Sequence, residues 1–399
     1  MGSALQNIKV LDLSRVLAGP WATQLLGDYG ADVVKVERPG SGDDTRQWGP
    51  PWLGSESAYF LCTNRNKRSI TIDISCARGQ ELVRALAREA DILIENFRVG
   101  TMARFGLDYD TLAAANPRLI YCSISAYGQS GSRAHEPGYD AMIQGEGGLM
   151  SITGPADTDD GGPQKVGVAI ADIMTGMYAT SAILAAVCAR SDSGRGQQID
   201  VPLYDTQVAW LANQGMNYLV GGTVPVRMGT AHPNLVPYQA FATSDGNMML
   251  AVGNDRQFAA AMGVLELGQL ATDELFATNA ARVASRQELV RRISERLATG
   301  TTSMWLAAFA AADVPAGPIN DIGQVLDGAY ARERELVGSL ENKAGDSVPT
   351  VRNPVRFEDT PAVYAKAPPL LGEHTEEVLR DWLGYSPEQV EALREEAAI

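Results

Sequence analysis

Histidine and cysteine are scarce in this chain, whose 399 residues include three histidines and four cysteines. The cysteines are far apart and form no Cys-x-x-Cys pair, which disfavours both structural zinc and a disulfide framework and fits a reducing, cytoplasmic location. So few histidines also make a His-centred metal site or catalytic triad a poor fit. We therefore expect no metal site, and chemistry that rests on carboxylates and backbone groups.

An excess of basic charge is also missing. Lysine and arginine number 33 against 48 acidic residues, and the formal net charge is −15. Such a surface disfavours nucleic acid and anionic membranes as partners. The longest low-polarity run, at residues 178–189, is too short to span a bilayer, and residues 1–11 lack the pattern of an export signal. We expect neither a nucleic-acid partner nor a membrane partner.

Strand-like and helix-like segments alternate through the first 125 residues. Strands are predicted at 8–13, 32–37, 69–74, 91–95 and 119–125, and helices at 21–29 and 78–90. This order predicts an α/β fold, a Rossmann-like parallel sheet with helices on both faces. The Gly-x-Gly-x-x-Gly fingerprint is missing after the first strand, which disfavours NAD or FAD.

The pattern changes in the second half of the chain. Strands at 238–243 and 248–252 flank a hairpin signal, Ser-Asp-Gly-Asn. Helical segments are predicted next, at 257–265, 285–298 and 302–312. We expect four parts: the first part of a large Rossmann-like domain at 1–200, a linker at 201–224, a smaller α+β domain at 225–325, and a return to the large domain at 326–399.

Asp172 stands at the start of an apolar stretch with helical periodicity. An aspartate there can be a helix N-cap, which accepts the free amide hydrogens of the first turn. It can also be a covalent nucleophile, kept ionised by those amides and by the positive end of the helix dipole. The local pattern is compatible with both interpretations.

Basic and aromatic side chains follow two of the predicted strands. Arg38 follows the second strand, Asn96, Phe97 and Arg98 follow the fourth, and Arg104 lies a turn or two later. Ligands of open α/β sheets bind outside the carboxyl ends of the strands. These residues could hold a phosphorylated, aromatic ligand, with cations for phosphate and Phe97 for a base. The alternative is ordinary solvated surface charge.

Two further segments could belong to the same site. Gly253 and Asn254 follow an apolar strand, where backbone N–H groups could contact a developing oxyanion or form a simple turn. Tyr139 and Asp140 precede a glycine-rich segment. Asp140 could hydrogen-bond a partner near the active centre, or it could cap the helix that begins there.

Taken in order, these segments resemble the class III CoA-transferase family, also called the formyl-CoA transferase or carnitine CoA-transferase family. The resemblance covers essentially the whole chain, with motifs at 12–20, 35–39, 64–69, 95–97, 167–176, 253–258, 314–318 and 371–375. It implies a large Rossmann-like domain built from both ends of the chain and a small middle domain. It also implies an interlocked homodimer, with two chains threaded through each other like links.

The resemblance places the family's nucleophilic aspartate at Asp172. Its carboxylate would attack the donor thioester, form an aspartyl anhydride, and then carry CoA as an aspartyl thioester until an incoming carboxylate reverses the sequence. The CoA thioester is thus a substrate, and no tightly bound cofactor is expected. The Gly253 loop would shield the anhydride from water.

The resemblance also implies CoA contacts and two departures from formyl-CoA transferase. The implied CoA-binding residues are Val16, Arg38, Lys67, Asn96, Phe97, Arg104 and Tyr139, to which the strand-end pattern adds Arg98. Leu17 stands where formyl-CoA transferase has a glutamine, so formyl and oxalyl substrates are not expected. Asp140 replaces a family glutamate.

Residues 42–51 and 227–241 resemble the succinyl-CoA:glutarate CoA-transferase branch. We expect succinyl-CoA as donor and a dicarboxylic acid such as glutarate or itaconate as acceptor, with mesaconate, malate and citramalate also open. Arg46, Arg227 and His232 are candidates to bind the remote carboxylate. Arg46 could instead meet a CoA phosphate, and His232 could be structural.

Two rival functions remain. The α-methylacyl-CoA racemases share the fold but need a histidine in a Gly-His-Asp motif, which here is Gly138-Tyr139-Asp140. Tyrosine, with a pKa near ~10, is a poor base at neutral pH, and His135 lies four residues early. The other rival is a non-catalytic acyl-CoA-binding protein, which would not require the acid at Asp172.

Overall fold

The computed structural model describes residues 2–399, which form two compact units, each built from separate stretches of the chain. The first unit takes in the described residues up to Leu149 together with Val166–Leu211 and Ala329–Ile399. The second comprises Met150–Lys165 and Ala212–Gly328. Its second stretch spans the residues 225–325 at which the sequence analysis places a smaller domain.

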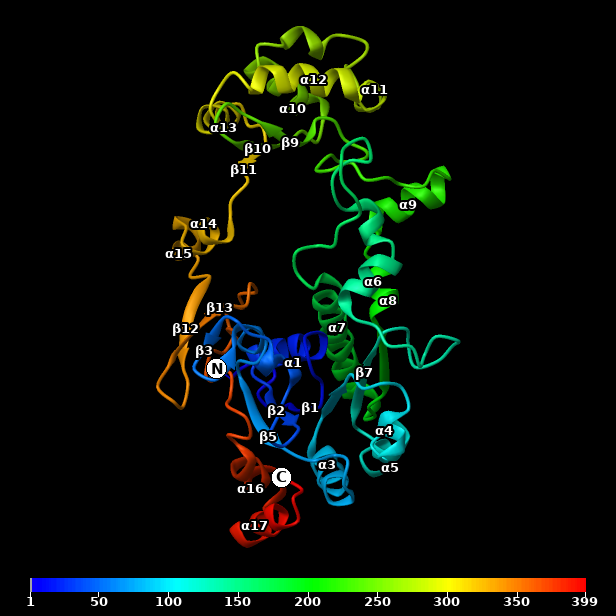
Figure 1. Cartoon of the computed structure of the whole chain (residues 1–399), viewed down its shortest axis with the longest axis vertical. Helices are drawn as coiled ribbons and strands as arrows, with labels where there is room; N and C mark the ends of the chain where they lie inside the picture. The colour runs from blue at the N-terminus through cyan, green and yellow to red at the C-terminus, as the bar shows by residue number, and fades with distance from the viewer. Residues whose placement is uncertain (1) are drawn as a thin grey trace. The chain divides into compact units, whose positions relative to one another are not determined.

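A six-stranded parallel sheet forms the centre of the first unit (Figure 1). Its strands are β1 (Lys9–Asp12), β2 (Asp32–Glu37), β5 (Lys67–Thr71), β6 (Ile92–Glu95), β7 (Ile120–Ser125) and β8 (Gln198–Pro202). They lie in the order β5-β2-β1-β6-β7-β8, so the direction of winding reverses between β1 and β6. This is the Rossmann order, and the predicted α/β fold with a parallel central sheet is confirmed.

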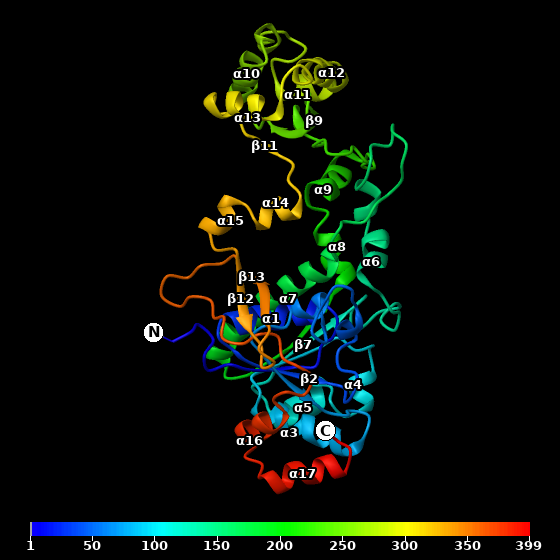
Figure 2. The same ribbon diagram turned by 60° about the vertical axis from the view of Figure 1, so that its left-hand side comes forward.

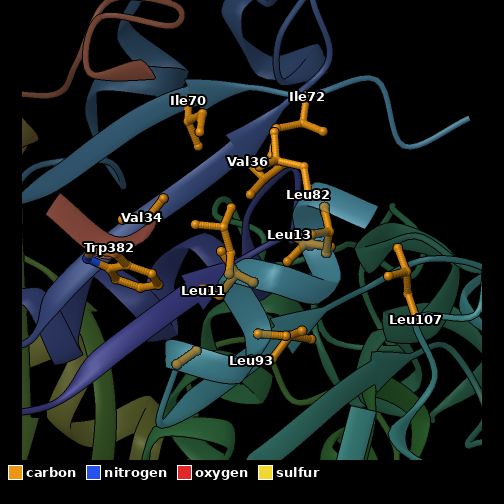
Figure 3. Close-up of a cluster of buried hydrophobic side chains, with 14 of the residues drawn as sticks. Leu11, Leu13, Val34, Val36, Ile70, Ile72, Leu82, Leu93, Leu107 and Trp382 are labelled. Atoms are coloured by element: carbon orange, nitrogen blue, oxygen red, sulfur yellow. The ribbon is translucent and has the colours of Figure 1, made fainter. Parts of the chain in front are cut away.

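Apolar residues cover both faces of this sheet because successive strand residues point to opposite sides. Val10 belongs to the core beneath α1 (Ala18–Asp28) and α7 (Ile170–Ser193). Its neighbour Leu11 belongs to the opposite core, with α3 (Ala77–Glu89), α16 (Thr375–Leu383) and α17 (Pro387–Glu395), where Leu93 and Trp382 also pack (Figure 3). Burying each such side chain contributes ~1.5–3 kcal/mol.

Shorter elements complete the first unit. They are η1 (Asp44–Gln47), β3 (Trp52–Leu53), β4 (Glu56–Ser57), α2 (Ala58–Leu61), α4 (Thr101–Arg104), α5 (Tyr109–Ala115), α6 (Asp140–Glu146), α8 (Leu203–Ala209), α15 (Ala329–Glu333), β12 (Val337–Glu341) and β13 (Ser347–Val351). β12 and β13 pair as a separate antiparallel hairpin.

The C-terminal part of the chain returns to strand β5 at one edge of the parallel sheet. The Asn66 amide donates to Lys366 O over 2.9 Å, and the His374 amide donates to Ser69 O over 2.9 Å. Immediately afterwards α16 begins and packs against α3 (Figure 2). The last strand edge on this side is thereby covered by chain from residues 366–375.

Helix α7 is longer and more apolar than the sequence analysis assumed. It has 24 residues with a mean hydropathy of 1.5 over its most apolar window, enough by length and composition to cross a membrane. The interpretation that took the run as residues 178–189 was therefore wrong about its length. Ala179, Ile183 and Ala186 are buried against the sheet, and α7 packs along α1, as a core helix does.

The second unit is a small α+β unit with its own core. Its antiparallel sheet has β9 (Tyr238–Ala242), β10 (Asn247–Ala251) and β11 (Ala316–Pro318) in the order β11-β10-β9. Its helices are α9 (Ala212–Gly221), α10 (Asp255–Val264), η3 (Gly268–Ala271), α11 (Asn279–Ala284), α12 (Arg286–Leu297), α13 (Thr302–Ala311) and α14 (Ile322–Leu326). The predicted hairpin is confirmed, with Met248 opposite Phe241.

Candidate active site

Two adjoining cavities lie at the carboxyl ends of the strands of the first unit. The larger, about 590 Å³, is lined by Arg38, Phe97 and Arg104 among others. The smaller, about 210 Å³, has Asp172 in its wall. Arg15 and Phe97 line both cavities. They flank the reversal point between β1 and β6, where ligands of this fold class bind.

The loop after β1 takes the place of the missing glycine fingerprint. Asn96 holds it on both sides, because its Oδ1 accepts from the Arg15 amide over 2.9 Å and its Nδ2 donates to Arg15 O over 2.7 Å. The next residue, Val16, has a φ of 69°, a left-handed conformation that a β-branched residue rarely adopts. Asn96 therefore fixes a strained loop whose residues 15–18 line the smaller cavity.

Asp43 holds the same loop by a hydrogen bond and is itself held by a buried lysine. Its Oδ1 accepts from the Val16 amide over 3.2 Å, and its Oδ2 binds the buried Lys35 Nζ over 2.9 Å. Burial alone would raise the pKa of Asp43, but Lys35 and hydrogen bonds from Thr45 outweigh it and hold that pKa at about 2. The carboxylate is therefore a permanent anchor for the strained loop.

Asp172 is the third residue of α7, not its N-cap. The helix begins at Ile170, and the N-cap position belongs to Ala169, which makes no side-chain capping hydrogen bond. The side chain of Asp172 is partly exposed and lines the smaller cavity. The capping interpretation is therefore wrong, and the carboxylate faces the space where a ligand would lie.

Asp140, and not Asp172, caps the N-terminus of α7. Its Oδ1 accepts from the Ala171 amide over 2.8 Å and from the Asp172 amide over 3.4 Å. Its Oδ2 accepts from Gln144 Nε2 over 2.7 Å, and Gln144 Oε1 in turn accepts from the Val166 amide over 2.9 Å. Asp140 thus does hydrogen-bond at the centre of the site, and the helix it caps is the one that carries Asp172.

This arrangement reverses the expected electrostatics of Asp172. Burial and, second, the negative charge of Asp140 raise the pKa of Asp172 from 3.8 to about 7. The first-turn amides donate to Asp140, so they stabilise its charge and not that of Asp172. The expectation that these amides keep Asp172 ionised is wrong.

The other residues expected at this site divide between the cavities. Arg38 and Arg104 are exposed side chains that line the larger cavity. Arg98 and Tyr139 line the smaller one, and Tyr139 is 66% exposed. The structure therefore brings these four together with Val16, Asn96, Phe97, Asp140 and Asp172.

Lys67 and Arg46 are not available to a ligand, which corrects two expectations. Lys67 is fully buried, and its Nζ contacts Asp12 Oδ2 at 3.2 Å and Asn64 Oδ1 and Pro20 O at 2.9 Å. The Arg46 guanidinium is 4% exposed. It donates to both oxygens of Glu37 over 2.7 and 2.8 Å, to Glu56 over 2.7 Å and to Pro369 O over 3.1 Å. Both cations stabilise the scaffold beneath the cavities.

Gly253 and Asn254 lie in the second unit, at the start of α10. Asn254 Oδ1 accepts from the Gln257 amide over 2.9 Å, and the Gly253 amide donates to Gln257 Oε1 over 2.9 Å. Asn254 is therefore the N-cap of α10, and Gln257 holds the residue before it. The simple-turn interpretation describes this geometry, and the amide of Gly253 would have to leave Gln257 to contact an oxyanion.

Arg227 and His232 also belong to the second unit. Arg227 forms an ion pair with Asp157 and donates from Nε to Pro155 O over 3.2 Å. His232 accepts from the Asn234 amide at Nδ1 over 3.0 Å, and its ring lies 5.2 Å from that of Tyr238. Arg227 is thus already paired, whereas His232 uses only one ring nitrogen in these contacts.

Sequence reasoning missed Arg15 as a cavity residue and Asp43 as a support, and it noted Gln144 only as a polar residue close to Asp140. Arg15 lies inside the motif at 12–20, so its place directly after the first strand was a usable signal. Asp43 gave no signal, because its role depends on a contact with Val16, distant in sequence. The contact of Gln144 with Val166 is likewise distant in sequence.

The chain is similar in sequence and in fold to known proteins. The sequence model described as CoA-transferase family III matches residues 5–375. A succinate–glutarate CoA-transferase from Agrobacterium fabrum is 48% identical over 383 residues, covering 94% of this chain and 95% of the relative. A Homo sapiens succinyl-CoA:glutarate CoA-transferase is 42% identical over 389 residues, covering 98% of this chain and 88% of the relative. The crystal structure of a CAIB/BAIF family protein from Brucella suis superposes with a TM-score of 0.83 at 46% identity, covering 96% of this chain and 100% of the other.

Proposed function

Since this chain belongs to CoA-transferase family III and is a CoA-transferase, we propose that it moves CoA from succinyl-CoA to a dicarboxylic acid through covalent intermediates on Asp172. The observation that carries the proposal is the carboxylate of Asp172 in the wall of a cavity that adjoins a second, cation-lined one. The names of the Agrobacterium and human relatives support succinate and glutarate as the acid pair.

The two cavities fit the two ends of a CoA thioester. Arg38 and Arg104 supply cations for phosphate in the larger cavity, and Phe97 offers an aromatic face. The thioester would then lie in the smaller cavity beside Asp172. CoA enters and leaves as part of the substrates, so the proposal needs no tightly bound cofactor.

The proposed chemistry exchanges one acyl bond for another at each step. A carboxylate oxygen of Asp172 attacks the thioester carbon, the C–S bond breaks, and CoA thiolate leaves behind an anhydride. The thiolate attacks the Asp172 carbonyl carbon, and the donor acid departs as a carboxylate. The acceptor carboxylate attacks the resulting aspartyl thioester and releases the thiolate, which then attacks the new acyl carbon and frees Asp172. The activated bond is conserved, so no ATP is needed.

The surroundings of Asp172 favour these covalent states. Its carboxylate is partly desolvated and lies beside the negative charge of Asp140. An anhydride or thioester at Asp172 is uncharged, so bond formation relieves both the desolvation and the repulsion. A carboxylate with a raised pKa is also a better nucleophile than one that binds its proton weakly.

We expect kcat/KM to rise about tenfold per pH unit up to pH ~7 and to level off above it, because only the ionised form of Asp172 attacks. Asp140→Asn should move the midpoint to lower pH, since it removes the negative charge but keeps an oxygen for the Ala171 amide. Initial rates between pH 5 and 9 on both proteins measure this. An unchanged midpoint in Asp140→Asn would show that Asp140 does not set it.

The test of the function is a chromatographic assay of purified protein with succinyl-CoA and a panel of free acids, glutarate first. A new acyl-CoA peak for one or two dicarboxylates identifies the acceptor. Absence of transfer to every acid would contradict the proposal. Deuterium exchange into a 2-methylacyl-CoA would then indicate a racemase, and binding of CoA without either reaction would indicate a non-catalytic binding protein.

We also propose that the enzyme is a homodimer with interlocked chains, as its family resemblance implies. Exposed apolar side chains support a self-contact, because such residues are unusual in numbers on a free surface. On α9, Leu219 and Val220 are 74% and 81% exposed, and Ile322 on α14 is 78% exposed. Light scattering during size exclusion should give twice the chain mass of 42.6 kDa. A single-chain mass would contradict the proposal.

A further inference from the structure

We propose that Arg15 binds the diphosphate bridge of the CoA thioester where the two cavities meet. The proposal rests on the CoA binding proposed above and assigns a role to a residue that is not among the CoA contacts implied by the family resemblance. Among the residues described, only Arg15 and Phe97 line both the larger and the smaller cavity. Any ligand that occupies both cavities must pass between them.

The base of the Arg15 side chain is fixed, whereas its tip is weakly held. Asn96 binds the backbone N–H and C=O of Arg15 over 2.9 and 2.7 Å. The guanidinium carbon lies 5.1 Å from the centre of the Phe97 ring, and Nη1 lies 3.3 Å from Asp44 Oδ2. Within residues 2–399 the buried Nε has no hydrogen-bond partner. A buried donor without a partner is costly and favours a ligand that supplies an acceptor.

The ion pair with Asp44 is easily exchanged for a stronger one. The Arg15 side chain is 34% exposed and that of Asp44 is 51% exposed. Exposed pairs of this kind contribute little to stability. A diphosphate offers two negative charges and several oxygens in the bidentate geometry that a guanidinium matches, and such charge-assisted bonds are stronger. We interpret Asp44 as a substitute anion that a phosphate displaces.

The order of groups along CoA agrees with this position. The phosphoadenosine end is followed by the diphosphate, then the pantetheine arm, then the thioester. If the ends occupy the larger cavity and the region beside Asp172, the diphosphate lies near the junction. Arg38 and Arg104 line only the larger cavity, and Arg98 does not line it. Arg15 is therefore the cation in position for the bridge.

Calorimetric titration of the full-length protein with CoA and with 3′-dephospho-CoA tests the assignment. Arg15→Gln should weaken the binding of both ligands by about the same factor, roughly tenfold, because both contain the diphosphate. Asp44→Asn is the matched control, since it breaks the same ion pair but leaves the guanidinium free. It should bind both ligands as well as the unmodified protein or more tightly.

Three outcomes would overturn the proposal. Equal affinity of Arg15→Gln and the unmodified protein would show that Arg15 makes no contact with CoA. Equal weakening by Arg15→Gln and Asp44→Asn would show that their ion pair merely holds the loop. A loss confined to CoA, with 3′-dephospho-CoA unaffected, would assign Arg15 to the 3′-phosphate. If the unmodified protein bound neither ligand, the proposed function itself would fail, which distinguishes the two failures.

Discussion

Replacing Asp172 with asparagine should abolish CoA transfer and at the same time stabilise the folded protein above pH 7. Asparagine keeps the shape of the side chain but has no anionic oxygen to attack a thioester, so we expect the rate to fall by at least about 10⁴-fold. Formation of labelled glutaryl-CoA from glutarate and succinyl-CoA that carries the label in its CoA part measures the loss. Retained turnover in Asp172→Asn would contradict the covalent mechanism.

The gain in stability follows from the pKa of Asp172. In the folded protein burial and Asp140 raise it from 3.8 to about 7, so between these values the folded state holds a proton that the unfolded chain has released. Stability therefore falls as pH rises from about 4 to 7, and the full penalty persists above 7. Asparagine avoids this penalty, and we expect a gain of about 1–4 kcal/mol at pH 8 that disappears below pH 4.

Urea unfolding of both proteins at pH 4 and pH 8 checks this sign. Asp172→Ala serves as the second variant, since it removes the charge and also leaves a small void, so its gain should be smaller. A nucleophile that lowers the stability of its own fold is typical of a functional site, because activity there often requires a group that is unfavourable for folding. Equal stability at both pH values would show that Asp172 carries no buried-charge penalty.

Replacing Arg46 with glutamine should lower the free energy of unfolding by about 3–5 kcal/mol, the usual effect of removing one partner from a buried ion pair. The variant leaves Glu37 and Glu56, whose side chains are 1% and 8% exposed, without their cation. It also removes the guanidinium that lies 3.7 Å from the Phe60 ring centre. Glutamine cannot neutralise two buried carboxylates.

The matched control is Arg394→Gln. Arg394 also pairs with two glutamates, Glu376 and Glu391, but its side chain is 45% exposed and theirs are 66% and 60% exposed. We expect less than about 1 kcal/mol from that change. Denaturant titration of both variants, together with the KM for glutarate, distinguishes a structural role of Arg46 from a role in binding the acceptor. A stable Arg46→Gln protein with a raised acceptor KM would restore the acceptor-binding role that the buried contacts argue against.

The sheet and the large cavity could be predicted because their signals are local. Strands buried on both faces are continuously apolar, as residues 92–94 and 119–122 are, and their ends mark the ligand edge of the sheet. Arg38, Phe97 and Arg104 were found in this way. The motif around Asp172 was equally visible, because an acid at the start of a long apolar stretch is conspicuous.

The roles of Arg46, Lys67 and Asp140 could not be predicted, because each depends on a partner elsewhere in the chain. A sequence shows that a residue is cationic, but not that its charge is already neutralised, as that of Lys67 is by Asp12, 55 positions away. Asp140 and Ala171 are 31 positions apart. Only the fold shows that the first-turn amides of α7 donate to the carboxylate of Asp140 and not to that of Asp172.

The covering of strand β5 by residues 366–375 has a consequence for how the protein is made. Ser69 and its partner His374 are separated by 305 positions, so the edge of the sheet has no partner until nearly the whole chain has been synthesised. At ~5–20 residues per second this interval is roughly 15–60 s. Throughout it the nascent chain presents an open strand edge, which is a template for aggregation. High contact order of this kind slows folding. We therefore expect chaperone supply and growth temperature to change the yield of native enzyme more strongly than they change the stability of the folded enzyme.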